Sequence, residues 1–415
     1  MKTVEPKTLK GFRDFLPQQA RKRQYVVDTL KKVFESYGFE PLETPALEYE
    51  EILLGKYGEE GDKLMYRFTD NGDRKVAMRY DQTVPLARVV AQYQNELAMP
   101  FKRYQIQNVW RAENTQKGRF REFLQCDCDI VGTTSALSDA EVIATSAKAL
   151  EKLGFTNYKI LLNDRVVFSL LMQRESVLQE KELMPIVRAI DKIKKIGREK
   201  VLEEIIAIGI PTERATYILQ AIETQESTQR LSEVMEYLTE LGVEKNKFEF
   251  LPTLARGLDY YTGLIFEIEI DGYSAGSVCG GGRYDELIGM FTGKQIPAVG
   301  FAFGFDRLME AMDELGLFPN ELSVTKVLVT IFSPELKEKS LETASFLRSK
   351  NINTEFYPDV NAKMEKQLKY ADQKGIPYVV IIGPDEAKNN TLTLKDLKKR
   401  TQETLSLDEA IKKLQ

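Results

Sequence analysis

The sequence predicts an α+β protein, with a large first domain built on an antiparallel sheet and a smaller C-terminal α/β domain. The chain has 415 residues, more than one hydrophobic core normally serves, so two or three domains are expected. Short segments rich in β-branched and aromatic side chains fill residues 65–132, which favours a mainly antiparallel sheet. From residue 326 onward, strand and helix patterns alternate as βαβαβ, which indicates a small parallel sheet.

The first elements are a helix and then extended chain. Apolar residues recur at helical spacing from Pro17 to Tyr37 and Gly38 follows, so an amphipathic helix that ends at glycine is predicted. Two prolines in FEPLETPALEYEEIL (residues 39–53) predict a strand or extended edge there. Four strands are then predicted from MYRFTD, KVAMRY, FKRYQIQNVWRAE and FREFLQCDCDIVG, with one short helix, PLARVVAQY, between the second and third.

The middle of the chain adds a helical segment to this sheet. Ser138 and Glu141 have capping-box spacing and predict a helix through Leu153, after which KILLND reads as a strand. From about 165 to 241 the sequence turns helical and rich in Glu and Lys, which suits an inserted subdomain. The segments FEFLPTLARGLDYYTGLIFEIEIDG, VCGGGRYDELIGMF and AVGFAFGFDRLMEAM then predict strands, a tight turn and a closing helix.

These patterns set the expected domain boundaries. The first domain is predicted at residues 1–322, interrupted by the helical insertion at about 165–241. A polar, proline-bearing linker, DELGLFPNELSVTK, precedes the second domain, which is predicted at residues 326–415.

The composition excludes several kinds of chemistry. The chain contains no histidine, so it has no Ser-His or Cys-His nucleophile, no His-ligated zinc and no histidine general base. Any catalysis must therefore rely on positioning, on arginine and carboxylate electrostatics, or on the groups of the substrate. The C-x-C pair Cys126 and Cys128 has no further ligands to make a zinc site, so no metal is assigned to the protein and its cysteines are expected to be reduced.

Charge and hydropathy bear on location and partners. The net charge of −5 supplies no global attraction to nucleic acid, so any RNA contact must come from local basic patches. The sequence has no run of membrane-spanning length and starts without a signal-peptide pattern, so we expect a cytoplasmic protein without membrane contact.

The strongest chemical cluster is YQIQNVWRAENTQKGRFREFLQCD. Arg111 and Glu113 end one strand, with spacing that places both on one face, while Arg119, Arg121 and Phe123 begin the next strand. An arginine fork clamps phosphate, a carboxylate accepts from an adenine amine, and an aromatic ring stacks on a base, so the cluster suits ATP. The alternative is a charged hairpin whose arginines pair with its own acids.

The order R-x-E, loop, R-x-x-x-F resembles motif 2 of the class II aminoacyl-tRNA synthetases. Pro45, in PLETPALEY, lies where the proline-bearing motif 1 of that family is expected, and GFAFGFDRL with Arg307 resembles motif 3. Read alone, GFAFGFDRL is equally a buried, glycine-spaced strand that enters a helix.

LARGLDYYTGLIFEI, GGGRYDEL and RYDQTVPLAR resemble segments of the histidyl-tRNA synthetases and their close paralogues. The resemblance implies attack of the histidine carboxylate on ATP and transfer of the histidyl group to the 3′ end of tRNA(His), with Mg²⁺ bound to the phosphates. It also implies a homodimer formed through the motif 1 region. The implied site residues are Arg256 and Arg111 at the α-phosphate; Arg111, Glu113, Arg119, Phe123 and Arg307 for ATP; Asp81, Thr83, Gln125, Asp129, Tyr261 and Tyr284 for L-histidine; and Gln116 for the tRNA acceptor end.

Several of these residues have structural alternatives. Tyr260 and Tyr261 also suit core aromatics, Asp81 a helix cap, and the glycines 280–282 a simple turn. Asp129 departs from members of the family that carry glutamate there.

The C-terminal sequence resembles the anticodon-binding domain of these enzymes. Lys395, Lys398, Lys399 and Arg400 are candidates for phosphate contacts, with a solvated surface as the alternative. Two other functions remain open: a regulatory paralogue without ligase activity, and a class II synthetase for another amino acid such as threonine or proline. Arg256 and the added C-terminal domain count against the first, and RGLDYYTG and GGGRYDEL against the second.

Overall fold

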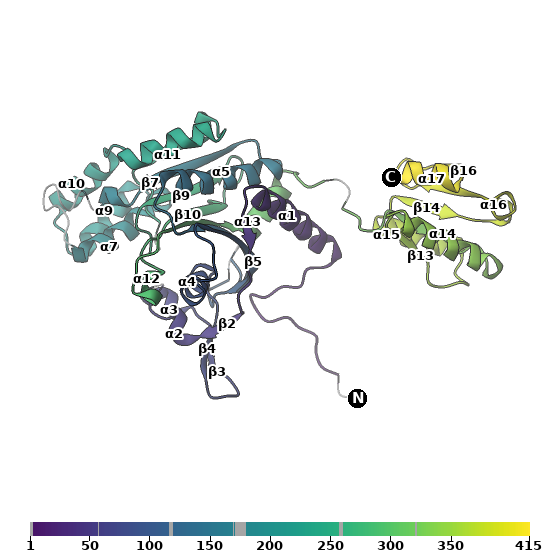
Figure 1. The fold of residues 1–415 in the computed structure, drawn as a ribbon, viewed down its shortest axis with the longest axis horizontal. Helices are drawn as coiled ribbons and strands as arrows, with labels where there is room; N and C mark the ends of the chain where they lie inside the picture. The colour runs from purple at the N-terminus through teal and green to yellow at the C-terminus, as the bar shows by residue number, and fades with distance from the viewer. Residues whose placement is uncertain are drawn as a thin grey trace. The chain divides into compact units, whose positions relative to one another are not determined.

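The computed structural model forms two compact units, one made mainly of the residues up to Phe318 and the other mainly of Pro319–Gln415 (Figure 1). The model describes residues 3–56, 58–115, 119–168, 170, 180–256, 260–319 and 322–415. Within these residues, none of the helices combines the length and the apolar character needed to cross a membrane.

The first unit is built on an eight-stranded sheet. Its strands are antiparallel except for the β1–β5 and β7–β8 pairs, which lie at its two edges and are parallel. From edge to edge the order is β1 (Glu40–Pro41), β5 (Phe101–Trp110), β6 (Glu122–Val131), β11 (Ala298–Gly304), β10 (Cys279–Arg283), β9 (Leu264–Ile270), β7 (Tyr158–Asp164) and β8 (Phe248–Phe250).

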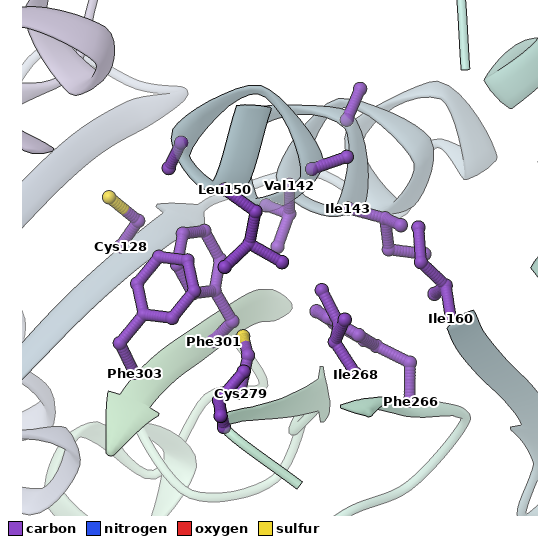
Figure 2. Packing of buried hydrophobic residues seen from close by; sticks show 14 of the residues in the cluster. Cys128, Val142, Ile143, Leu150, Ile160, Phe266, Ile268, Cys279, Phe301 and Phe303 are labelled. Atoms are coloured by element: carbon purple, nitrogen blue, oxygen red, sulfur yellow. The ribbon is translucent and has the colours of Figure 1, made fainter. Parts of the chain in front are cut away.

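The main core lies between this sheet and four helices. The helices are α1 (Pro17–Ser36), α5 (Ala136–Lys152), α11 (Gln229–Glu240) and α13 (Phe305–Glu314), and each adds buried apolar side chains to one cluster. Figure 2 shows Val142 and Leu150 of α5 packed over Phe301, Phe303 and other sheet residues. One face of the sheet is therefore sealed, which leaves the opposite face for function.

Helix α5 starts three residues earlier than the capping-box prediction placed it. Ser135 is the N-cap, and its side chain accepts a hydrogen bond from the backbone N–H of Leu137. The predicted cap, Ser138, lies in the first turn and donates its hydroxyl to the Ser135 carbonyl. Sequence spacing alone did not distinguish the two serines, because both precede the same apolar run.

A smaller sheet and the helices α2 (Glu50–Leu53), α4 (Thr83–Gln92) and α12 (Gly289–Thr292) pack around a second core beside the main one. The sheet has the order β2 (Leu47–Tyr49), β4 (Lys75–Met78) and β3 (Arg67–Thr69), and all of its pairs are antiparallel. The extended prediction for residues 39–53 was wrong at its end, because Glu50–Leu53 forms one helical turn, α2, that buries Leu53. Helix α3 (Gly58–Lys63) follows α2 in the chain.

The helical region has its own core only in its first part. Helices α7 (Glu180–Ile190), α8 (Ile193–Ile196), α9 (Arg198–Ala207) and α10 (Thr212–Glu223) bury a separate apolar cluster. Helix α11 instead buries Leu231, Val234 and Leu238 in the main core, next to α5. The helical sequence to 241 therefore spans two different packing units.

The glycines at 280–282 form strand β10 in the middle of the main sheet, so the predicted turn was wrong. Gly281 and Gly282 pair with Phe301 and Gly300 of β11 on one side. A Cβ on Gly281 would lie 2.3 Å from the carbonyl oxygen of Gly300. These residues are glycine because side chains and backbone from neighbouring strands occupy the space that a Cβ would need.

The second unit has a mixed five-stranded sheet, in the order β13 (Thr354–Phe356), β12 (Val327–Val329), β14 (Tyr378–Ile381), β15 (Thr391–Asp396) and β16 (Thr401–Ser406). The first three strands are parallel, as the βαβαβ pattern predicts, but the β15–β16 hairpin makes the rest antiparallel. Its helices are α14 (Lys337–Ser349), α15 (Met364–Lys374), α16 (Pro384–Asn389) and α17 (Leu407–Leu414), with short 3₁₀ turns at Lys245–Lys247 in the first unit and Pro334–Leu336 in the second.

Candidate active site

A pocket of about 360 Å³ opens on the face of the main sheet opposite α5. It brings together the candidate residues from segments far apart in the sequence. Gln116 lies outside the described residues. All the other predicted site residues line the pocket: Asp81, Thr83, Arg111, Glu113, Arg119, Phe123, Gln125, Asp129, Arg256, Tyr261, Tyr284 and Arg307.

The floor of the pocket comes from two paired strands. Gln125, Asp127 and Asp129 alternate along β6 and therefore share one face. Their register partners on β11 are Gly304, Ala302 and Gly300. A row of polar side chains thus lies beside a row with almost no side chains, and this leaves room for a ligand above the sheet.

Gly300 is required by the position of Asp129. A Cβ on Gly300 would lie 1.8 Å from Oδ1 of Asp129, far inside van der Waals contact. The glycine spacing that suggested motif 3 therefore has a local reason at this position, which is to admit the carboxylate.

Asp129 is held by two buried partners. The Tyr284 hydroxyl donates to Oδ1 of Asp129, and Nη2 of Arg103 lies 2.7 Å from Oδ2. Arg103 is fully buried, and its Nη1 donates to Gln105. Burial raises the pKa of Asp129, against the opposing effects of Arg103 and Tyr284. The structure thus places Asp129 and Tyr284 together, and Arg103, which we did not predict as a site residue, lies behind them.

Asp127 is a pocket residue that our sequence analysis missed. It is 2% exposed, and its Oδ1 has no hydrogen-bond partner among the described residues. Burial raises its pKa well above the usual value, partly opposed by Arg103 and increased by Asp129 and Asp81. The alternation from Gln125 to Asp129 was the available signal, because a strand that directs both of these side chains into a pocket directs Asp127 there too.

Arg111 lies just after the end of β5 and not within it. Its Nε donates to the carbonyl of Tyr80 at 3.1 Å, and its guanidinium lies 4.4 Å from the Tyr80 ring centre and 5.2 Å from that of Phe123. The aromatic rings and the carbonyl fix the guanidinium at the pocket wall. Tyr80 was a further residue that we missed.

Glu113 and Arg119 form an ion pair with each other, 3.3 Å apart and partly exposed. This is the pairing that the charged-hairpin alternative predicted, although both residues also line the pocket. Arg307 donates from Nη1 to the carbonyl of Ser277 at 3.0 Å. Exposed pairs of this kind contribute about 0–1 kcal/mol, so a phosphate can readily replace the carboxylate as the partner of Arg119.

Arg256 lines the pocket beside β9 and β10 in an unusual backbone conformation, with φ of +31°. Its Nη1 donates to Glu267 at 3.0 Å, and Nη1 would be 1.7 Å from a Cβ on Gly280. Burial lowers the pKa of the guanidinium, but Tyr261 and Glu267 outweigh this effect and the net pKa is raised. Non-glycine residues at positive φ are strained and persist where surrounding contacts hold them, so Arg256 is a rigidly placed cation.

Asp81 is both a helix cap and a pocket residue. Its Oδ1 accepts from the backbone N–H groups of Thr83 and Val84 at the start of α4, both at 3.1 Å. The helix-cap alternative is therefore observed, while the residue still lines the pocket.

The N-terminal segment also reaches this site. Arg13 and Arg23 donate to the two oxygens of Asp306, at 2.7 and 3.0 Å. The guanidinium of Arg13 lies 3.2 Å from the ring centre of Phe120, which lines the pocket together with Asp306. The segment before α1 thus braces the loop between β5 and β6.

The carboxylates of the pocket do not form a dedicated metal cage. Within the described ranges, no group of three or more Asp, Glu or Cys side chains is arranged to hold a metal ion. The three cysteines are free and buried, and burial raises the pKa of each thiol well above its usual value, so none is an activated nucleophile.

A largely antiparallel sheet with arginines gathered over one face, joined to a separate α/β unit, defines a class II aminoacyl-tRNA synthetase. Two family models match the chain: "Histidyl-tRNA synthetase" over residues 11–308 and "Anticodon binding domain" over residues 326–415. The chain belongs to the histidyl-tRNA synthetase family.

Individual relatives match over nearly the whole length. A protein of Cytophaga hutchinsonii named histidine–tRNA ligase is 39% identical, with 99% of each chain covered. A protein of the same name from Gloeobacter violaceus is 40% identical, with 96% of each chain covered. The crystal structure of a histidyl-tRNA synthetase from Nostoc sp. PCC 7120 is similar with a TM-score of 0.87 and 32% identity, covering 99% of this chain and all of that one.

Proposed function

We propose that this chain activates L-histidine with ATP to form histidyl adenylate and transfers the histidyl group to the 3′ end of tRNA(His). The observation that carries the proposal is one pocket in which Arg111, Arg256, Asp129 and Tyr284 meet, in a chain that belongs to this family along its length. The catalytic domain spans residues 1–322 with the helical insertion at about 165–241, and residues 326–415 form the anticodon-binding domain.

Arg111, Glu113, Arg119, Phe123 and Arg307 form the proposed ATP subsite. Phe123 offers a ring face for the adenine, and Glu113 accepts from its amine once the pair with Arg119 opens. Arg119 and Arg307 then bind the outer phosphates through charge-assisted hydrogen bonds, which are about twice as strong as neutral ones.

The first chemical step needs no general base. The substrate carboxylate is already ionised and attacks the α-phosphorus of ATP, whose bond to the bridging oxygen breaks and releases pyrophosphate. Arg111 and Arg256 both line the pocket and stabilise the negative charge that develops on the α-phosphate oxygens. Because Arg256 is already fixed by Glu267, little reorganisation opposes this stabilisation.

Asp81, Thr83, Gln125, Asp129, Tyr261 and Tyr284 form the proposed histidine subsite. Gln125 has a buried Oε1 without a partner among the described residues, and with Asp81 and Thr83 it takes the α-ammonium end of histidine. Asp129 and Tyr284 lie at the imidazole end, where a hydroxyl oxygen and a carboxylate can accept from a ring N–H. A wrong side chain would leave these buried groups unpaired, which strongly disfavours its binding.

Mg²⁺ is proposed as an ion that arrives with ATP. Mg²⁺ commonly takes one or two protein carboxylates and completes its shell with phosphate oxygens and water. Glu267 lines the pocket and would fit that limited role, with one oxygen holding Arg256 and the other available to the ion. The ion would neutralise phosphate charge, while the arginines orient the phosphates.

In the second step the terminal adenosine hydroxyl of the tRNA attacks the adenylate carbonyl carbon, and AMP leaves. A phosphate oxygen of the adenylate is a suitable acceptor for the hydroxyl proton. Gln116 is proposed to approach the tRNA acceptor end from the loop between β5 and β6. The protein is further proposed to be a cytoplasmic homodimer that pairs through the motif 1 region around Pro45.

A regulatory paralogue is the main competing function. It would bind histidine without needing a rigid cation at the α-phosphate. The strained conformation of Arg256 favours the enzyme, because strain of this kind usually serves a function.

The test is ATP–pyrophosphate exchange with each of the twenty amino acids, comparing the wild-type chain with Arg256→Ala. Histidine-dependent exchange that falls at least about 100-fold in the variant is expected. A folded wild-type chain that exchanges with no amino acid would instead favour the regulatory function, and exchange with threonine or proline would reassign the substrate.

A further inference from the structure

The pocket has three buried carboxylates whose partners differ, those of Asp81, Asp127 and Asp129. Asp81 accepts two backbone N–H groups of α4. Asp129 is engaged on both oxygens, by Tyr284 and by Arg103. Asp127 has a buried Oδ1 that no described residue satisfies. Oδ2 of Asp129 also lacks a hydrogen bond, but the Arg103 cation lies 2.7 Å from it. Among these acids, only Asp127 therefore presents a buried oxygen that has neither a hydrogen bond nor an ion pair with a described residue.

A buried carboxylate oxygen without a hydrogen bond destabilises a folded protein unless a ligand or water supplies a donor. Nearly all buried polar atoms are hydrogen-bonded, and an unsatisfied one costs the desolvation of the group. Asp127 is 2% exposed but still lines the pocket, opposite Ala302, whose small side chain leaves space above it. A ligand in the pocket is the natural source of the missing partner.

The position of Asp127 along β6 indicates which part of the bound histidine it contacts. Gln125 precedes it at the proposed ammonium end and has its own unsatisfied acceptor, Oε1. Asp129 follows it at the ring end, where the Tyr284 proton is already donated to the carboxylate. The Tyr284 and Asp129 pair can serve one nitrogen of an imidazole, and a second ring nitrogen then needs another partner.

We propose that Asp127 binds the second imidazole nitrogen of histidine, so that Asp127 on one side and the Tyr284–Asp129 pair on the other contact both ring nitrogens. This inference rests on the proposed histidine activation and names a specificity residue for it. Arg103 acts as a positioning residue: it is buried against Asp129 and tied to Gln105, which keeps the two carboxylates in place without touching the substrate.

The charges of the floor fit a cationic ring. The buried guanidinium of Arg103 contacts Asp129 and also interacts electrostatically with Asp127. One positive charge against two carboxylates leaves negative charge that a ring N–H⁺ can neutralise. Whether the shared proton resides on the ring or on Asp127, both ring nitrogens are hydrogen-bonded.

The absence of histidine from the chain allows a direct experiment. When histidine labelled with ¹⁵N in the ring is bound to the wild-type protein, its two nitrogens give the only imidazole signals in the sample. Neither nitrogen is expected to show the shift of an unbonded pyridine-type nitrogen. Asp127→Asn should change the shift of one nitrogen, and Tyr284→Phe chiefly that of the other.

Kinetics give a second measurement on the same variants. In pyrophosphate exchange, Asp127→Asn should raise the KM for histidine about 10- to 100-fold while leaving kcat and the KM for ATP within about threefold. Asp271→Asn, which changes an exposed acid outside the pocket, is the matched control and should change none of these values. Inhibition by 3-(imidazol-4-yl)propionate, which has the ring but no amino group, should weaken by the same factor as histidine binding.

Three results would overturn the inference. They are a free pyridine-type ring nitrogen in the wild-type complex, unchanged ring shifts and KM in Asp127→Asn, or a loss confined to histidine while the amine-free analogue binds as before. The last result would make Asp127 an ammonium ligand. A wild-type chain that neither binds histidine nor exchanges would instead defeat the proposed function, so the two failures are distinguishable.

Discussion

At the scale of single residues, the pocket depends on buried charges whose partners are few. Arg103 has no exposure and lies against Asp129, and Asp127 is buried beside them. Charges that leave water are stable in a fold only when a partner remains. Substituting one of these three residues should therefore remove a charge partner from the other two.

Arg103→Met should lower the free energy of unfolding by about 3–5 kcal/mol, because it leaves Asp129 buried without its cation. Chemical denaturation monitored by circular dichroism measures this loss. Arg74→Met is the matched control, since Arg74 pairs with Asp70 on the surface and its loss should leave the unfolding midpoint unchanged. Equal midpoints for the two variants would contradict a structural role of the buried pair.

The stability of the protein should fall as the pH rises, in part because of Asp127. Burial, together with Asp129 and Asp81, raises its pKa above the usual 3.8, while Arg103 and Arg111 oppose the shift. The folded chain then keeps a proton that the unfolded chain has released, so the free energy of unfolding decreases from about pH 4 up to the folded pKa.

Asp127→Asn removes this titration. The variant should therefore gain stability relative to the wild type as the pH rises, by an amount on the order of 1–3 kcal/mol. Denaturation curves at several pH values measure the difference, with the ligand-free protein in each case. A stability difference that does not change with pH would show that Asp127 is ionised in both states.

At the scale of secondary structure, strand β10 shows how one element serves both folding and chemistry. Its consecutive glycines face different neighbours, because successive positions of a strand point to opposite faces. A Cβ on Gly280 would meet the Arg256 side chain, whereas a Cβ on Gly281 would meet the backbone of β11. The two positions should therefore respond differently to the same substitution.

Gly280→Ala should keep the fold but displace the Arg256 guanidinium, which can move because it is the end of a flexible side chain. The rate of histidine-dependent exchange should fall about 100-fold, as expected for a misplaced catalytic group, with little change in Tm. Gly281→Ala should instead lower the Tm markedly, since the backbone cannot yield. Similar losses of Tm in both variants would contradict this division.

At the scale of the whole molecule, two units divide the proposed work between amino-acid chemistry and tRNA recognition. The candidate phosphate contacts of the second unit, Lys395, Lys398, Lys399 and Arg400, lie at and beside the β15–β16 turn, where the last three are exposed. The net charge of −5 makes such a local patch necessary for binding an RNA backbone.

Reversing the charges of Lys398, Lys399 and Arg400 to glutamate should raise the KM for tRNA in aminoacylation about tenfold or more and leave pyrophosphate exchange unchanged. The triple variant Lys337→Glu, Lys339→Glu and Lys350→Glu, which reverses three exposed charges on and after helix α14, is the control for net charge. A loss of exchange in the turn variant, or an equal loss of tRNA binding in the control, would argue against the turn as the contact site.

The lack of histidine predicts that synthesis of this chain does not stall when charged tRNA(His) is scarce. During histidine starvation, its synthesis should continue longer than that of a variant with histidine at exposed positions such as Gln24 and Lys32. Pulse labelling measures both rates. Equal synthesis of the two chains would contradict the idea.

The sequence by itself determined the α+β class, most of the sheet strands and twelve of the residues that line the pocket. Pocket residues such as Asp81, Arg256 and Tyr284 follow from the resemblance to a known family, whereas the class and the strands depend on local pattern: strand alternation and the helical period of α1. They could be read without coordinates because each is repeated within a short segment.

Only the tertiary structure decided which residues become partners. Gly280–Gly282 form a strand because they pair with β9 and β11, and they are glycine because Arg256, Tyr261 and the neighbouring backbone occupy the space of a side chain. Arg103 and Asp127 became site residues because β5 and β6 pair in a register that buries them together. Such effects depend on contacts between distant segments, and no local pattern contains the shape of the neighbour.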